Sequence, residues 1–142
     1  MLRVLVPVTD RSEIECAARH VLARYQGRQV LLYLVNVQLP IPRFVARFVN
    51  RRQLDEFHRE SGMQILEPLA DRLAAAGIPC QMRVLVGLNA ETIACFAREH
   101  HCDHIMVARQ KGVLDSMGLG SIGSQLRHLL GGDGGCVVNE VY

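Results

Sequence analysis

The sequence predicts an α/β fold: a single domain over residues 1–142 with a doubly wound, five-stranded parallel sheet (strand order 3-2-1-4-5) and helices on both faces. Three observations lead to this prediction. Short, valine-rich apolar runs alternate with longer amphipathic segments, which is the pattern of β-α units. Most of these runs are apolar at nearly every position, as expected for parallel strands buried on both faces. A chain of 142 residues suffices for one hydrophobic core, and right-handed crossovers make such a sheet doubly wound.

The first part of the chain contains two predicted strands and the helix that joins them. Residues 2–8 form the first strand. Ser12 and Glu15 have the spacing of a capping box, which predicts the start of a helix that Gly27 ends. Residues 29–37 form the second strand, because they are again almost wholly apolar.

The pattern changes after the second strand. Residues 41–52 are amphipathic, with Arg43, Arg47 and Arg51 on one face. The other face contains Ile41, Phe44, Val45, Phe48 and Val49. We interpret this segment as a solvated flap over a crevice or a dimer seam; docking of its arginines on a membrane or an acidic partner is the alternative. A long helix follows and ends at Gly77, with the position of any break at Gly62 or Pro68 left open.

The last part of the chain repeats the alternation. Residues 80–86 are the third strand, and Asn89 can cap the helix that follows. Residues 104–107 are the fourth strand, and an amphipathic helix begins after a glycine turn at residues 118–121. The last short strand begins at Cys136.

Composition narrows the function classes. The formal net charge of +2 argues against a dedicated nucleic-acid binder, which needs a strong basic excess. The five cysteines include no Cys-x-x-Cys pair, and Cys16 and Cys95 fall on predicted inward helix faces, so we expect buried thiols in a reducing compartment. The N-terminus lacks a signal-peptide pattern, and no apolar run approaches the length of a membrane span. We therefore expect a cytoplasmic, soluble protein without a membrane partner.

The stretch between the fourth strand and the last helix is the best candidate for a site. A glycine turn that opens onto a helix exposes free backbone N–H groups at the positive end of the helix dipole, where anions bind. Ligands of doubly wound sheets lie beyond the carboxyl ends of the strands. This rule places Asp10, Val37, Gly87 and residues 108–121 around one crevice.

Five segments, in this order, resemble the universal stress protein family over nearly the full length of the chain. Residues 5–13 (LVPVTDRSE) are similar to the family's opening strand and turn, and residues 31–38 (LLYLVNVQ) to its second strand. Residues 86–93 (VGLNAETI) resemble the entry to its third helix. Residues 102–107 (CDHIMV) resemble its fourth strand, and residues 120–122 (GSI) resemble the start of its last helix.

The resemblance implies a binding site for ATP, with Mg²⁺, as in many members of the family. In that reading the Val37 main chain meets the adenine edge, and Asp10 meets the ribose. The N–H groups of residues 120–122 meet the phosphates, with Arg109 or Lys111 adding charge. The implied binding residues are Pro7, Thr9, Asp10, Val37, Val107, Ala108, Arg109, Gly112, Gly120, Ser121 and Ile122.

The sequence departs from the family's nucleotide motif, Gly-x2-Gly-x9-Gly-[Ser/Thr]. Ala108 or Arg109 stands at the first glycine, and seven residues separate Gly112 from Gly120. Thr9 stands where the family has its aspartate. Three hypotheses therefore remain open: a stress-response binding module with a degenerate ATP pocket, a regulatory scaffold without nucleotide, and a slow ATP hydrolase.

The resemblance also implies a homodimer that forms through the last strand, Cys136–Val141. A physical motive exists as well, because an apolar edge strand is stabilised when a second copy covers it.

Other patterns favour ordinary structural roles. Gly118, Gly120 and Gly123 match a dinucleotide fingerprint, but they lie far from the preceding strand and close to the end of the chain. The run of residues 100–104 (HHCDH) contains metal-binding residue types, but neighbouring side chains on a helix end or strand point apart. No Ser-His-Asp or Cys-His site can be assigned, so we expect no catalytic residue and no metal ligand.

Overall fold

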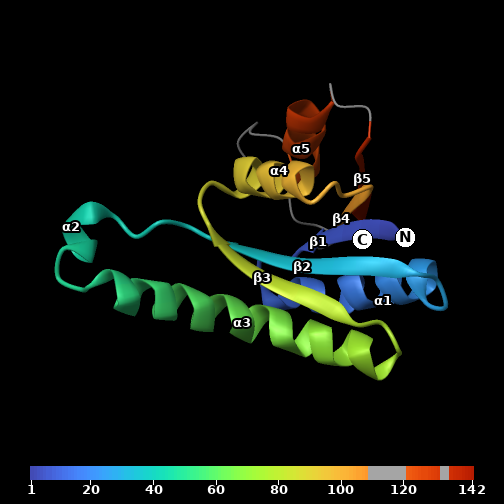
Figure 1. Ribbon diagram of the computed structural model, residues 1–142, viewed down its shortest axis with the longest axis horizontal. Helices are drawn as coiled ribbons and strands as arrows, with labels where there is room; N and C mark the ends of the chain where they lie inside the picture. Colours follow the sequence, from blue (N-terminus) through green and yellow to red (C-terminus); the bar gives the residue numbers. More distant parts are fainter. Residues whose placement is uncertain (109–120, 132–134) are drawn as a thin grey trace.

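The computed structural model describes residues 1–108, 121–131 and 135–142. These residues form a five-stranded sheet in the order β3-β2-β1-β4-β5, with all neighbouring strands parallel (Figure 1). The strands are β1 (Leu2–Pro7), β2 (Val30–Gln38), β3 (Cys80–Val86), β4 (His104–Ala108) and β5 (Val137–Val141). The predicted α/β fold and strand order are confirmed.

Helices cover both faces of the sheet. They are the 3₁₀ turn η1 (Arg11–Glu13) and the helices α1 (Ile14–Tyr25), α2 (Arg43–Ala46), α3 (Arg51–Ala75), α4 (Asn89–Glu99) and α5 (Ile122–Leu130). Helices α1 and α3 lie on one face, and α4 and α5 lie on the other (Figure 1). None of these described helices combines the length and the apolar character that crossing a bilayer requires.

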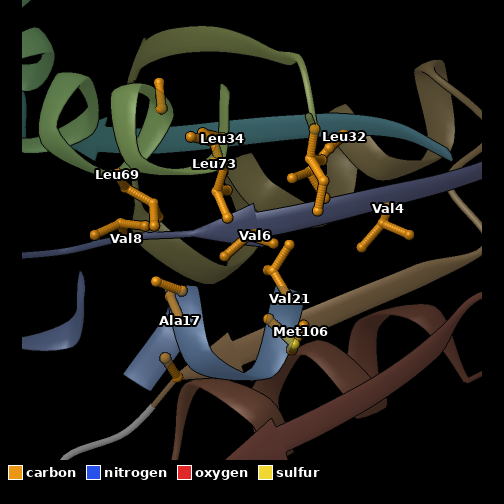
Figure 2. Packing of buried hydrophobic residues seen from close by; sticks show 14 of the residues in the cluster. Val4, Val6, Val8, Ala17, Val21, Leu32, Leu34, Leu69, Leu73 and Met106 are labelled. Atoms are coloured by element: carbon orange, nitrogen blue, oxygen red, sulfur yellow. The ribbon is translucent and has the colours of Figure 1, made fainter. Parts of the chain in front are cut away.

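The sheet divides the hydrophobic core into two layers. Strands β1 and β2 alternate between the layers: Val4, Val6, Leu32 and Leu34 point toward α1 and α3, as Figure 2 shows. Their neighbours Leu5, Tyr33 and Val35 point toward α4 and α5. Because both sets are buried, the central strands need apolar residues at nearly every position, which is the pattern that predicted them.

Helix α3 continues without a break through Gly62 and Pro68. Gly62 is buried, and an added Cβ would lie 2.5 and 2.6 Å from the two methyl carbons of Val84. The missing side chain therefore lets α3 lie directly against β3.

Three local predictions are wrong. Asp10, not Ser12, caps the first helical turn, and Glu15 instead binds Arg72 of α3, with Nη2 and Oε1 3.0 Å apart. Helix α4 begins one residue earlier than predicted: its N-cap is Leu88, which has no capping side chain, so Asn89 is the first helical residue. The helical phase of α4 also leaves Cys95 exposed rather than buried.

Candidate functional site

The carboxyl ends of the central strands bring the first group of predicted binding residues together. Pro7 lies opposite Val35 of β2, and Leu5 lies opposite Ile105 of β4. Pro7 and Val107 each lie two residues beyond this last pair, toward the carboxyl ends of β1 and β4. Sheet order reverses between β1 and β4, so these residues stand at the topological switch point.

The turn after β1 is built by two acidic side chains. The Asp10 carboxylate accepts the backbone N–H of Ser12 at 2.7 Å and also binds its hydroxyl. Oε2 of Glu13 accepts the N–H groups of Thr9 and Asp10, each at 2.8 Å. Burial raises the pKa of Glu13 above its ordinary value of 4.5, although the two backbone hydrogen bonds oppose that rise. Thr9 and Asp10 are thus held at the end of β1. Oδ1 of Asp10 caps the first helical turn by accepting the N–H of Ser12.

A side chain of β2 hydrogen-bonds to the chain just after β1. Asn36 is 1% exposed, and its Nδ2 donates to the carbonyl of Val8 at 2.8 Å. Gln38 donates to Oδ1 of Asn36 at 2.6 Å. Val37 lies opposite Leu85 of β3 and packs against the α4–α5 layer of the core. Asn36 therefore fixes where β1 ends relative to Val37.

The second group of predicted residues surrounds the start of α5. Ser121 is the N-cap, and its hydroxyl accepts the N–H of Ser124 at 3.0 Å. The same hydroxyl donates to Oε1 of Glu140 at 2.6 Å. Glu140 lies opposite Val107 in the sheet, so α5 begins beside the end of β4. Ile122, the first helical residue, packs against the α4–α5 layer.

A carboxylate thus lies at the N-terminus of α5. It also fills the space that a Cβ of Gly123 would occupy, so the glycine gives it room to reach Ser121. A negative charge is stabilised at a helix N-terminus, where the dipole is positive. This is the position at which a bound anion would be expected.

The remaining predicted binding residues lie outside the described part of the chain. Arg109, Gly112 and Gly120, with Lys111, fall in residues 109–120. The structure therefore places Pro7, Thr9, Asp10, Val37, Val107, Ala108, Ser121 and Ile122, and their role in binding stays a prediction.

Three residues of this edge were not found from the sequence: Glu13, Asn36 and Glu140. Two of them carry a recognisable signal. Asn36 is a lone amide within the apolar run of β2, and a polar residue in such a strand needs a buried partner. Glu140, together with Asn139, interrupts the valine-rich last strand.

The histidine-rich run at the end of α4 has structural contacts. His100 stacks on Phe96 with ring centroids 3.8 Å apart, and Oδ2 of Asp103 accepts the N–H of Arg3 at 2.9 Å. Burial raises the pKa of the Cys102 thiol to about 11. Among residues 1–108, 121–131 and 135–142, no group of three or more His, Cys, Asp or Glu side chains could hold a metal ion.

The fold and this edge define a doubly wound α/β protein whose polar groups gather at the switch point of the sheet. The universal stress protein family model matches residues 1–130. The chain belongs to the universal stress protein family. A comparison with curated protein sequences found no match.

Solved structures share the fold at low sequence identity. The universal stress protein UspA from Lactobacillus plantarum is 19% identical, with a TM-score of 0.71 over 99% of this chain and 97% of its own. A universal stress protein from Archaeoglobus fulgidus in complex with dAMP is 15% identical, with a TM-score of 0.67 over 100% and 98% of the two chains. A family protein from Arabidopsis thaliana with AMP bound is 16% identical, with a TM-score of 0.67 over 99% and 91%.

Proposed function

We propose that this chain is a stress-response binding module that binds an adenine nucleotide at the carboxyl edge of its sheet. One observation carries the proposal: β1 and β4 are neighbours where the sheet order reverses, and the N-terminus of α5 lies beside the end of β4, on the same edge of the sheet as the carboxyl ends of β1 and β2. The complexes of two family members with dAMP and AMP support an adenine nucleotide as the ligand class.

The described residues suggest how the ligand is held. The edge of β2 at Val37 offers main-chain groups to the adenine ring, and the turn at Thr9 and Asp10 lies where a ribose would sit. The first N–H groups of α5 and the Ser121 hydroxyl offer hydrogen bonds to phosphate. ATP with Mg²⁺ is the ligand that the family resemblance implies. AMP has a single phosphate and therefore needs fewer of these contacts.

Glu140 weakens this site for phosphate. Its carboxylate binds the Ser121 hydroxyl at 2.6 Å and already stabilises the positive end of α5. A phosphate that takes the same position meets a like charge, and like charges at close range repel. The pocket therefore favours weak binding, and a scaffold that works without nucleotide is the second candidate function.

Enzyme activity is the less favoured alternative. Slow ATP hydrolysis needs a carboxylate that is free to hold Mg²⁺ beside the phosphates. The Asp10 carboxylate instead caps the turn after β1 through Ser12. We therefore expect binding without turnover.

Assembly and location complete the proposal. Strand β5 is an outer strand of the sheet, and Val137 on it is 52% exposed. Pairing of Cys136–Val141 with the same strand of a second copy would cover this edge and give a homodimer. The free thiols among the described residues fit a reducing compartment, so we place the protein in the cytoplasm.

Calorimetric titration with Mg²⁺-ATP, AMP and adenosine tests the proposal. We expect AMP and ATP to bind, and the E140Q variant to bind AMP several-fold more tightly because a repulsive charge is removed while the hydrogen-bond acceptor remains. Adenosine affinity should not change in E140Q. The matched control is E67Q, which removes one exposed carboxylate from α3.

Each alternative has its own outcome. If neither AMP nor ATP produces heat of binding with wild-type protein or E140Q, the nucleotide proposal is wrong and the scaffold function stands. Release of ADP from ATP would establish the hydrolase instead. Light scattering after gel filtration measures the mass, and a monomer at all concentrations would contradict the dimer.

A further inference from the structure

The segment between β2 and α3 exposes large apolar side chains. Within residues 39–52, here named the basic–aromatic tip, Leu39 is 69%, Phe44 69% and Phe48 76% exposed. From its sequence we interpret this segment as a solvated flap, and its apolar side chains are exposed among the described residues. Full burial of one such side chain is worth about 1.5–3 kcal/mol, so open exposure of several together marks an interaction surface.

The same segment concentrates positive charge. Arg43, Arg47, Arg51 and Arg52 lie between Leu39 and Leu54, and no acidic residue lies there. The segment therefore carries a formal charge of +4, although Arg52 forms an ion pair with Glu56 of α3, with Nε and Oε1 3.3 Å apart. Because the whole chain has a formal net charge of +2, the rest sums to −2. The guanidinium of Arg47 lies over the ring of Phe48, 4.8 Å from its centroid. Exposed apolar side chains and arginines thus lie together in one short segment.

The shape of the tip is convex. Helix α2 stands beyond the end of the sheet, at the far end from the chain termini (Figure 1). No other described element packs broadly against it. A protruding segment with exposed apolar and basic side chains fits a flat, deformable surface rather than a preformed pocket.

The charge pattern decides between the possible occupants. A second copy bound through the same surface about a two-fold axis would bring the arginines of the two tips together, and like charges repel. An anionic surface attracts them instead. Arginine-rich segments with phenylalanine on the opposite face bind at the interface of anionic bilayers.

We propose that the basic–aromatic tip docks the protein on an anionic lipid surface. Phe44 and Phe48 enter the boundary between headgroups and acyl chains, and Arg43, Arg47 and Arg51 contact lipid phosphates. The attachment is peripheral and does not depend on nucleotide binding. It replaces the sequence-based expectation that no membrane takes part.

Flotation with vesicles tests this proposal directly. We expect wild-type protein to float with phosphatidylcholine vesicles that contain about a quarter phosphatidylglycerol, and not with phosphatidylcholine alone. The R43Q/R47Q variant should bind roughly 25-fold more weakly, at about five-fold per arginine. The F44S/F48S variant should lose binding by at least about ten-fold.

A charge-matched control uses the opposite end of the sheet. Arg24 and Arg28, near the end of α1, are both exposed, so R24Q/R28Q removes the same charge from a distant surface. This variant should keep most of its vesicle binding. An equal loss in R24Q/R28Q and R43Q/R47Q would overturn the proposal, because attraction would then depend on net charge alone.

A fluorescent reporter gives a second readout. The chain has no tryptophan, so F48W introduces a single one. Its emission should shift to shorter wavelength when phosphatidylglycerol vesicles are added, as the indole enters the interface. No shift, or no flotation of the wild-type protein, rejects lipid docking. Binding to polyglutamate but not to vesicles would identify an acidic protein as the occupant, and a dimer lost in F44S/F48S would identify a second copy.

Discussion

Replacing Asn36 with aspartate tests whether one buried amide holds the end of β1. The Asn36 side chain is 1% exposed; it donates to the Val8 carbonyl at 2.8 Å and accepts from Gln38 at 2.6 Å. Aspartate has the same size but no N–H to donate when it is ionised. The substitution therefore places a carboxylate oxygen against the Val8 carbonyl. It leaves the volume of the side chain almost unchanged.

The expected loss of stability has two parts. A buried carbonyl without its donor costs about 1–3 kcal/mol. Ionising a carboxylate at a buried site costs more, about 1.4 kcal/mol for each unit by which its pKa rises, and a rise of about two units adds roughly 3 kcal/mol. The sum of about 4–6 kcal/mol corresponds to a fall in Tm of about 10–20 °C for a chain of this size.

Thermal unfolding of N36D and wild-type protein at two pH values measures both parts. The pKa of the new carboxyl is raised in the folded state, so its charge penalty is full above that pKa and vanishes below about pH 3.9, the unfolded value. The difference in Tm should shrink between about pH 7 and pH 4.5. N139D, a substitution in β5 at a less buried asparagine, should change the free energy of unfolding by less than about 1 kcal/mol. A fall of under about 2 °C for N36D, or one independent of pH, would refute the reasoning.

Three further predictions rest on other contacts in the structure. G62A should lower Tm, because overpacking against β3 costs about 1–3 kcal/mol and offsets the about 1 kcal/mol gained in helix propensity; a higher Tm would contradict the close approach. E13Q should flatten the pH dependence of stability above pH 4.5. The pKa of Glu13 is raised in the folded state, so its contribution to the free energy of unfolding is greatest below pH 4.5 and declines as pH rises through the folded pKa. The free energy of unfolding at neutral pH should be no lower in E13Q than in wild-type protein. Alkylation at mildly alkaline pH should modify Cys95 before Cys80 and Cys102, as followed by peptide mass spectrometry, because Cys95 is exposed. The hydrogen bond to Glu99 raises the pKa of Cys95, but burial raises the pKa of Cys80 and Cys102 to about 11 and also shields them from the reagent. Equal rates at Cys95 and Cys102 would mean that α4 does not cover that part of the core.

The strands and their order could be predicted because the signal is local and repeated. Each central strand of a parallel sheet is buried on both faces, so it is an apolar run that stands out between amphipathic helices. Right-handed crossovers then restrict the ways to connect such units, although they also allow other doubly wound orders such as 2-1-3-4-5. The length of helix α3 was predicted, but whether the helix is continuous was not. A glycine within a helix suggests a break, and only the contact with β3 shows why Gly62 is there.

The caps and the exposed faces could not be predicted for a different reason. Asp10, Ser12 and Asn89 are all good capping residues, and the backbone path after the preceding strand decides which of them is used. Periodicity likewise shows that residues 41–52 have an apolar face but not whether anything covers it. The contact between Ser121 and Glu140 joins residues 19 positions apart, so only the folded sheet could reveal it.

The two flanks of the sheet differ in chemistry. On the outer strand β3, Gln81 and Arg83 are exposed and joined by a hydrogen bond of 2.9 Å, and a charged residue on such a strand discourages another strand from adding to it. The opposite flank, β5, presents Val137 instead. If two copies meet along β5, the two outer strands of the combined sheet are both β3, and each carries the charged residue that discourages pairing. Growth by strand addition then stops at a pair and does not proceed to a fibre.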